Sequence, residues 1–546
     1  MTVSRTFELY RRNWLLILGF AGLSLWLGYT APEQPSFVAA FMAAGLLVTI
    51  VVARPAAPPR MFLGAMAAVL IGYPFLGRGF AYIGVPPVFI GEIVLALGLA
   101  TAVVNRRRWD AFHSRVAWVL VGVGVWGAFR TVPYLGTYRV DALRDAVVWG
   151  YGAFALLLVP LILQRGLLER VPAWFAGCIP WFLLWAPIAF TLSLAFGAQL
   201  PYFPGTTNVR ILSVKPGDFG VHLGGIAAFL LLGLHRFPLA RTQVSAIGRR
   251  WLHRAEAFWW IVWLLGFVAV ASLNRGAMLA MLVAGGVVVL LRPGVAGRRV
   301  AWVSGIVVVF VLTLYAFDVT IERDGRDISA RQVVDNTLSI AGSQPGAGGN
   351  LEGTKRWRLM WWEKIMGYTI HGQYFWTGKG FGINLAVDDG FKGSSGFLRS
   401  PHNGHLTVLA RSGVPGIALW ILLHSSFVIA LVGAHLRSRR RGQELVALMS
   451  IWVLAYWSAF MVNATFDVAL EGPHVGIPFW SLFGLGLALI IQSQRAISVK
   501  PGSQQGLRRS QSHNVPAPTA AVHHHFAQAA IKPGAARRYP RLPHDQ

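Results

Sequence analysis

Long uninterrupted apolar runs constrain this chain more than any other feature. Several runs reach the roughly 18–20 residues that a helix needs to cross a bilayer. Apolar residues make up 55% of the 546 residues and charged residues only 13%, about half the charged fraction of an ordinary soluble chain. A soluble globular enzyme and a disordered or fibrous chain are therefore excluded. The runs predict an all-α integral membrane protein with about 12–14 transmembrane helices. The predicted spans are approximately 14–30, 36–53, 61–77, 81–104, 116–136, 140–163, 174–197, 217–235, 257–273, 277–291, 300–317, 404–432, 444–466 and 476–492.

The distribution of charge predicts the orientation of these spans. The formal net charge is +27, from 49 Lys and Arg against 22 Asp and Glu. Most of the basic residues fall in alternate loops, such as 105–115, 236–256 and 435–443, and in the residues after the last span. The positive-inside rule places these segments and both termini in the cytoplasm. The charge thus reports multi-pass topology with some attraction to anionic membrane lipids, and we expect no nucleic-acid partner.

The chain then divides into four parts by composition. We expect N-terminal transmembrane helices over 1–317, an outer (periplasmic or extracellular) loop over 318–403, C-terminal transmembrane helices over 404–492, and a disordered basic cytoplasmic tail over 493–546. The outer loop is the one long loop between predicted spans, and loops of that length usually carry function.

Within the outer loop, residues 355–370 predict a helix rich in Trp and basic residues, which suits a membrane interface. Its lysines, Lys355 and Lys364, have the alternative role of contacting lipid headgroups only. The glycines of Gly378–Gly382 predict a tight turn rather than a phosphate loop, because the full P-loop spacing is missing. We interpret Asp388 and Asp389 as part of a solvated loop, since they lack the spacing of an Asp-x-Asp metal motif.

The end of the outer loop combines a proton acceptor with an anion site. Ser400 is a good N-cap and Pro401 a good first helical residue, which would put His402 in the first turn of the next span. The partial positive charge at a helix N-terminus disfavours a protonated imidazole, and a neutral imidazole is a suitable general base. Free N–H groups in the same turn hold anions. The alternative is a histidine at a water interface with no chemistry. His405, three residues later, is a supporting candidate.

Arginines on the predicted outer side form the second unusual feature. Arg275 lies in the short turn between two spans, on the side that the positive-inside rule keeps poor in cations. Several guanidinium groups facing one region suit a phosphate or diphosphate. Other basic residues on or near this side are Arg210, Lys215, Arg356, Arg358 and Arg411. Inside the spans, Glu92 and His222 are functional candidates by default, although Glu92 has the alternative of pairing with Arg130.

These landmarks, in this order, resemble the O-antigen ligase/polymerase superfamily over roughly residues 260–490. The segments that carry the resemblance are Ser272–Leu279 (SLNRGAML), Arg358–Ile365 (RLMWWEKI), Gly378–Gly382 (GKGFG), and His402-Asn403 with Leu406, Leu409, Gly413 and Gly416 (HNGHLTVLARSGVPG). The last run, after a long outer loop, is the most specific of them. One departure is Arg411, where relatives often have an acid before the glycine.

The resemblance implies a fold related to the GT-C membrane glycosyltransferases. It implies a lipid-linked glycan donor, usually on undecaprenyl diphosphate, a glycan or lipid acceptor, an inverting reaction, and no metal or other cofactor. By the resemblance, His402 would take the proton of the acceptor hydroxyl, and Arg275 and Arg358, with Arg356 as the alternative, would hold the diphosphate. Supporting residues would be Asn403, His405, Arg210 and Lys215.

Several alternatives stay open at this point. Within the superfamily the protein is a ligase to lipid A core, a polymerase of repeat units, or a transferase to protein. From other classes, a polysaccharide or lipid flippase and a non-catalytic scaffold are the rivals. A transporter predicts internal repeats and polar groups at the bilayer midplane, whereas the unusual residues here fall at the outer edge.

Overall fold

The computed structural model describes residues 58–85, 88–105, 108–164, 166–204, 206, 209–237, 250–251, 253–321, 328–340, 349–391 and 398–495. The chain divides into two units, Met1–Ala496 and Ile497–Gln546, and all described residues belong to the first. The predicted spans 14–30 and 36–53 and nearly all of the predicted tail lie outside the described residues.

Each predicted span from 61–77 onward contains an apolar helix. These are α4 (Pro58–Leu76), α5 (Ile90–Val104), α6 (Arg115–Thr131), α8 (Val140–Gly150), α9 (Gly152–Gln164), α10 (Val171–Ala195), α11 (Pro216–Leu231), α13 (Glu256–Leu273), α14 (Arg275–Leu291), α15 (Pro293–Ala316), α19 (Gly404–Arg440), α20 (Glu444–Phe466) and α21 (Pro473–Arg495). Within the described part of the chain, eight helical segments are long and apolar enough to cross a membrane, or nine if α8 and α9 form one bent span. Three more, α5, α11 and α14, are apolar but shorter. The all-α integral membrane fold is therefore confirmed.

Two predicted spans differ in detail from the helices. The prediction of a helix over 81–104 was too long, because α5 begins only at Ile90 and follows a short antiparallel pair, β1 (Gly84–Val85) and β2 (Val88–Phe89). Pro86 and Pro87 account for this, since proline interrupts the hydrogen bonds of a helix. The predicted span 140–163 is bent by 44° between α8 and α9.

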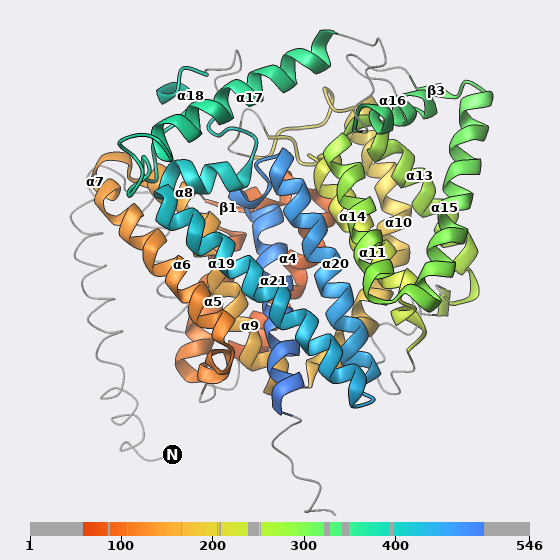
Figure 1. Ribbon diagram of the computed structural model, residues 1–546, viewed down its shortest axis with the longest axis horizontal. Helices are drawn as coiled ribbons and strands as arrows, with labels where there is room; N and C mark the ends of the chain where they lie inside the picture. Colours follow the sequence, from red (N-terminus) through yellow and green to blue (C-terminus); the bar gives the residue numbers. More distant parts are fainter. Residues whose placement is uncertain are drawn as a thin grey trace, which may run out of the picture. The chain divides into compact units, whose positions relative to one another are not determined.

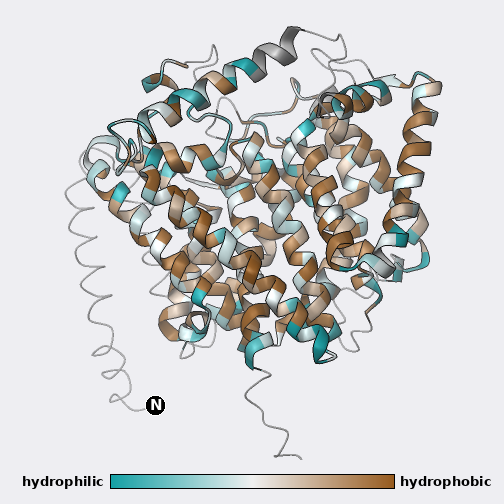
Figure 2. Ribbon diagram, viewed as in Figure 1, coloured by the Kyte–Doolittle hydropathy of each residue, from teal (hydrophilic) through white to brown (hydrophobic). Residues whose placement is uncertain are grey.

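The outer-loop elements lie together at one end of the helix bundle, at the top of Figure 1. They are the antiparallel pair β3 (Thr320–Ile321) and β4 (Ile328–Ser329), with α16 (Ala330–Ile340), α17 (Gly349–Thr369) and α18 (Leu385–Asp388). The short α7 (Leu135–Tyr138) links α6 and α8 at the same end. Apolar residues predominate along the helices below them, as Figure 2 shows.

The centre of the bundle is formed by α20 and α21. In its most apolar window α21 is 94% buried, against 6% for α15, which therefore lies at the edge of the bundle. Glycines allow two of the close contacts: a Cβ on Gly220 would lie 2.6 Å from the Cβ of Ala277, and one on Gly484 would lie 2.9 Å from the backbone of Ala155. Small residues of this kind let membrane helices approach closely. The packing around α20 matters because Asp467, directly after its last residue, contacts His402.

A break in α19 shapes the segment that follows His402. Gly413 has φ 69° and ψ −171°, and Pro415 follows it. The break exposes backbone carbonyls of the preceding turn, and these accept hydrogen bonds from the glycine-rich turn: Lys379 N to Ala410 O at 2.7 Å and Gly380 N to Arg411 O at 2.9 Å. The turn Gly378–Gly382 and the break at Gly413, which belong to two of the sequence landmarks, therefore meet at the same contact. The prediction of a tight turn over Gly378–Gly382 is consistent with this geometry.

Candidate active site

His402 lies directly before α19 rather than inside its first turn. Asn403 is the N-cap, and its side chain accepts hydrogen bonds from the backbone N–H groups of His405 and Leu406 at 3.0 Å each. The prediction that Ser400 caps the helix and that His402 is helical was therefore wrong. His402 instead has φ 52°, a left-handed conformation that few residues with a side chain adopt.

The side chain of His402 contacts Asp467, which directly follows the last turn of α20. The Nδ1 atom lies 3.5 Å from Asp467 Oδ1. The Nζ atom of Lys215, the N-cap of α11, lies 3.3 Å from Asp467 Oδ2. Burial disfavours the charged form of Asp467, but the hydrogen bond from His402 and the charge of Lys215 outweigh it and hold the pKa of this carboxyl below its ordinary value. Asp467 is thus an anion beside the imidazole.

Sequence reasoning missed Asp467. Its signal was present, because it is an acid at the predicted outer end of the span 444–466. However, it is 65 residues after His402, and nothing in the local sequence pairs the two. Lys215, in contrast, was a supporting candidate, and the structure joins it to His402 through the carboxylate of Asp467.

Helix α17 brings Arg358 to the same place. Its Nη1 donates to the carbonyl oxygen of Phe466 at 3.1 Å, one residue before Asp467. Two tryptophans fix α17 against the His402 turn: the indole of Trp362 donates to Pro401 O at 3.0 Å, and the ring of Trp357 lies 6.4 Å from the His402 ring.

The neighbouring basic residues of α17 behave differently. Arg356 is exposed, and the side chain of Lys355 lies outside the described residues. Lys364 donates to the backbone oxygen of Asp389 at 2.7 Å, so it binds protein and not only lipid headgroups.

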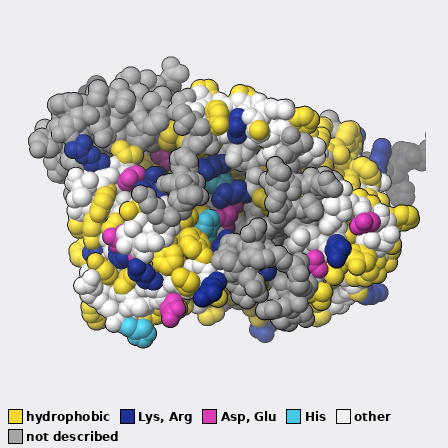
Figure 3. Space-filling model, turned by 90° about the horizontal axis from the view of Figure 1, so that it is seen from above, with side chains coloured by type: hydrophobic (Ala, Val, Ile, Leu, Met, Phe, Trp, Pro, Cys, Tyr) yellow, Lys and Arg dark blue, Asp and Glu magenta, His cyan; other side chains and the backbone are white. Residues whose placement is uncertain are grey.

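Arg275 begins α14, whose first turn contacts the same end of α20. A Cβ on Gly276 would lie 2.9 Å from the Cβ of Phe466, so the backbone beside Arg275 directly abuts the last turn of α20. Asn274 caps α14 by accepting a hydrogen bond from Ala277 N. Arg275, Arg358 and His402 therefore lie around one helix end rather than on opposite sides of the bundle. In Figure 3, which looks onto this face, Lys or Arg, His, and Asp or Glu side chains gather in a hollow near its middle.

Two basic candidates have structural partners instead. Arg210 lies over the ring of Tyr202, 3.8 Å from its centroid, and donates to Leu200 O. Arg411 is 1% exposed and forms a salt bridge with Asp145 at 2.9 Å. The guanidinium of Arg411 is therefore buried inside the protein.

His405 is held on both ring nitrogens. Its Nδ1 lies 3.2 Å from the donating indole of Trp420, and its Nε2 lies 3.2 Å from Met461 O. This arrangement fixes the ring as part of the packing between α19 and α20.

Two further interpretations need correction. Asp389 is 1% exposed rather than solvated: it accepts from the indole of Trp361 at 2.7 Å and forms a salt bridge with Lys379. Glu92 does not pair with Arg130; it accepts from the hydroxyl of Tyr151 at 2.6 Å and from Phe89 N at 3.1 Å near the start of α5.

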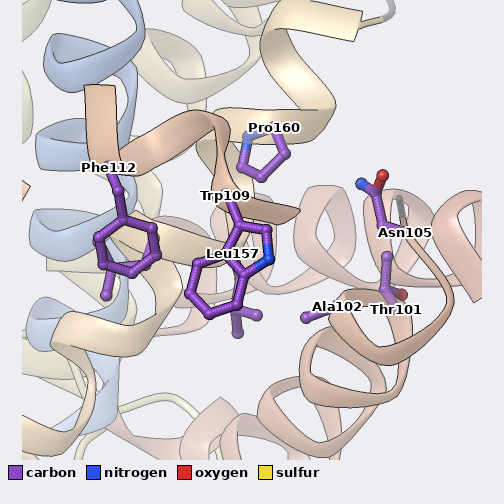
Figure 4. A pocket seen from close by; sticks show the side chains of 8 residues that line it. Thr101, Ala102, Asn105, Trp109, Phe112, Leu157 and Pro160 are labelled. Atoms are coloured by element: carbon purple, nitrogen blue, oxygen red, sulfur yellow. The ribbon is translucent and has the colours of Figure 1, made fainter. Parts of the chain in front are cut away.

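His222 also has a partner inside the bundle, the hydroxyl of Tyr456 at 2.5 Å. A separate apolar pocket of about 200 Å³ lies between α5, α9 and the segment 108–113, lined by Trp109, Phe112 and Leu157 among others (Figure 4). None of its lining residues belongs to the cluster around His402. Among the described residues, no group of three or more His, Cys, Asp or Glu side chains is placed to hold a metal ion.

The fold and this cluster define a multi-pass membrane protein with a polar site where helix ends meet at one end of the bundle. Residues 260–421 match the model of a family described as O-antigen ligase, which confirms the superfamily predicted from the sequence. The matched stretch includes Arg275, Arg358 and His402, whereas Lys215 and Asp467 lie outside it. No curated protein matches the chain. The match supports a membrane glycan ligase or polymerase in general terms, with a lipid-linked glycan and an acceptor as the substrates that the family implies.

Proposed function

We propose that this protein transfers or polymerises a glycan from an undecaprenyl diphosphate carrier onto an acceptor hydroxyl at the outer face of the inner membrane, in cell-surface polysaccharide biosynthesis. The observation that carries the proposal is the convergence at the end of α20. The imidazole of His402 contacts Asp467, Arg358 binds the carbonyl of Phe466, and the start of α14, with Arg275, abuts Phe466.

The reaction that this geometry supports is a single displacement with inversion. His402 accepts the proton of the acceptor hydroxyl on Nε2, because its Nδ1 faces the carboxylate of Asp467. The acceptor oxygen forms a bond to the anomeric carbon of the donor as the bond from that carbon to the diphosphate oxygen breaks. The lipid diphosphate leaves with the bonding electrons, and Arg275 and Arg358 stabilise its charge. No metal takes part in this scheme.

Basic residues at one end of the bundle support a site on the outer side of the membrane, at the opposite end. The last turn of α19 carries Arg437, Arg439 and Arg440, and α21 ends at Arg495. Both of these ends lie at the bottom of Figure 1, away from α16, α17 and α18. The positive-inside rule assigns that basic end to the cytoplasm.

The test is transfer by the purified protein in lipid vesicles that contain a diphosphate-linked glycan. We expect His402→Ala to abolish glycosidic bond formation while donor binding survives, because only the base is lost. His371→Ala is the matched control, since His371 is an exposed outer-loop histidine two residues after the end of α17. Full transfer by folded His402→Ala would refute the assignment of the base.

Arg358 and Arg356 offer a second matched pair, two residues apart on α17. We expect Arg358→Ala to weaken donor binding more than Arg356→Ala, because only Arg358 is seen to contact the end of α20. The reverse order would assign the diphosphate to Arg356.

Three alternative acceptors separate the possible roles of the enzyme. Transfer to lipid A core indicates a ligase, transfer to a second donor molecule indicates a polymerase, and transfer to a protein indicates a protein glycosyltransferase. Movement of the donor across the bilayer without a new glycosidic bond would favour a flippase.

A further inference from the structure

One buried carboxylate joins four segments that surround the His402 turn. Asp145, on α8, has a side chain that is 8% exposed. Its Oδ2 accepts from the backbone N–H of Gly382 at 3.0 Å and pairs with Arg411 Nη2 at 2.9 Å and with Arg399 Nη2 at 3.2 Å. We infer that Asp145 is a positioning residue for the reaction: it acts through Arg399 to hold His402 in place. This inference rests on the proposed function of His402.

Arg411 and Arg399 link Asp145 to further backbone groups. Arg411 donates from Nη1 to the carbonyl oxygens of Gly380 at 3.3 Å and Ile383 at 3.2 Å, so it ties α19 to the glycine-rich turn. Arg399 donates from Nη2 to Gly382 O at 2.9 Å as well as to Asp145. The carboxylate is thus the common partner of Arg399 and Arg411 from different segments, and its Oδ1 also pairs with Arg144, beside it on α8, at 3.5 Å. Charged groups away from water are stable only when they are paired in this way.

Arg399 controls His402 because only two residues separate them. Ser400 is buried, and the carbonyl oxygen of Pro401 accepts from Trp362 on α17. Arg399 therefore anchors one end of a short connection whose other end is fixed by the Asn403 cap. Between these anchors His402 keeps φ 52°, a conformation that persists only where the surroundings enforce it.

The opposite side of the turn is held by Asp467. His402 is therefore restrained from two directions, by the Asp467 contact at its ring and by the Asp145–Arg399 pair at its backbone. A shift of about 1 Å in a catalytic group costs on the order of a hundredfold in rate. Loss of the Asp145 charge should thus reduce turnover without removing any group that contacts the donor.

The experiment compares Asp145→Asn with Asp141→Asn in the full chain in lipid vesicles. Asp141 is one turn earlier on α8, has a side chain that is 47% exposed, and pairs with Arg144 at 3.1 Å and Arg399 at 3.5 Å. Asp141→Asn removes the same charge as Asp145→Asn, but the exposed ion pairs of Asp141 contribute little to stability. We expect kcat to fall about ten- to a hundredfold in Asp145→Asn with the KM for the donor within about twofold. Both constants should stay near wild type in Asp141→Asn. Hydrogen exchange of the backbone over 398–404 should accelerate in Asp145→Asn only.

A second variant covers the case in which Asp145→Asn does not fold. Arg399→Gln removes the connection to the His402 turn but leaves the Asp145–Arg411 pair intact, and Arg399→Lys should restore part of kcat. Wild-type kcat in folded Asp145→Asn or Arg399→Gln, or an equal loss in Asp141→Asn, would overturn the inference. If the wild type forms no glycosidic bond, the proposed function itself fails, and if His402→Ala keeps full transfer, the base assignment on which this inference rests fails. If His402→Ala is inactive and Arg399→Gln is fully active, only the positioning role fails.

Discussion

Replacing Asp467 by Asn tests the site most directly, because it removes one charge and keeps the shape of the side chain. Asp467 Oδ1 lies 3.5 Å from His402 Nδ1, and the Asp467 side chain is 15% exposed. The carboxylate has two effects on the imidazole: it orients the ring so that Nε2 faces the acceptor, and it stabilises the imidazolium that forms when the proton is taken.

The magnitude follows from the distance. Two unit charges 3.5 Å apart attract by about 5 kcal/mol at an effective dielectric constant of about 20. Lys215, at 3.3 Å from the same carboxylate, offsets part of this attraction. We therefore expect the transition state to lose about 2–3 kcal/mol in Asp467→Asn, which is a decrease of about thirtyfold to a hundredfold or more in kcat.

The assay is single-turnover transfer from the lipid-linked donor, measured across pH 5 to 9. The loss should appear in kcat rather than in donor affinity, since Asp467 is itself an anion and does not bind the diphosphate. The pKa of Asp467 is held below its ordinary value, so its carboxylate stays ionised over this whole range and its effect on the imidazole is present throughout. An unchanged kcat in folded Asp467→Asn at every pH would refute this role.

Two further predictions concern the stability of the outer loop. Hydrogen bonds to acidic partners outweigh burial and raise the pKa of Lys379, which forms a salt bridge with the buried Asp389. Lys379→Met should therefore lower the free energy of unfolding by about 2–3 kcal/mol. In thermal unfolding this loss should be complete below the pKa of a lysine in the unfolded chain, about 10.4. It should shrink as the pH rises through the raised pKa of Lys379 in the folded protein. Gly380→Ala should destabilise by about 2 kcal/mol or more, because φ is +84° and its Cβ would lie 2.1 Å from the ring of Tyr134. Gly390→Ala, at φ +77° with open space around it, should cost only about 1 kcal/mol. Equal losses in the two glycine variants would contradict the steric argument.

The membrane helices could be predicted from the sequence because their signal is local. A window of about 20 apolar residues determines a span without reference to the rest of the chain. The span 444–466 agrees with α20 to the residue. Where prolines interrupt the run, as at Pro86 and Pro87, the predicted helix was too long because an apolar window does not register a lost hydrogen bond.

The start of α19 shows why the site was harder to predict. Ser400 and Asn403 are both good N-caps by residue type, and Pro401 favours the earlier start. Asn403 is the cap in the structure, where residues 399–401 are instead bound to Asp145 and Trp362 from distant segments. Contacts of this kind decide between two locally acceptable alternatives, and the sequence alone does not contain them.

The pairing of His402 with Asp467 is the strongest example of this limit. Each residue lies at the end of a different helix, and their contact depends on how α19 and α20 pack over their whole length. Likewise, Arg411 and Arg358 were both candidate anion binders by sequence, and only the fold separates the buried salt bridge of the first from the helix-end contact of the second.

The site residues occur at helix ends, and this position bears on the choice between a transferase and a flippase. Lys215 caps α11, Arg275 begins α14, and His402 directly precedes the cap of α19, so three helix N-termini meet the end of α20. Helix N-termini carry partial positive charge and unpaired N–H groups, which favour an anion such as a diphosphate at this surface. A transporter instead needs its binding groups near the bilayer midplane, where both sides have access. The midspan His222 is bonded to Tyr456, whereas the candidate site residues lie at helix ends, as transfer at the membrane surface requires.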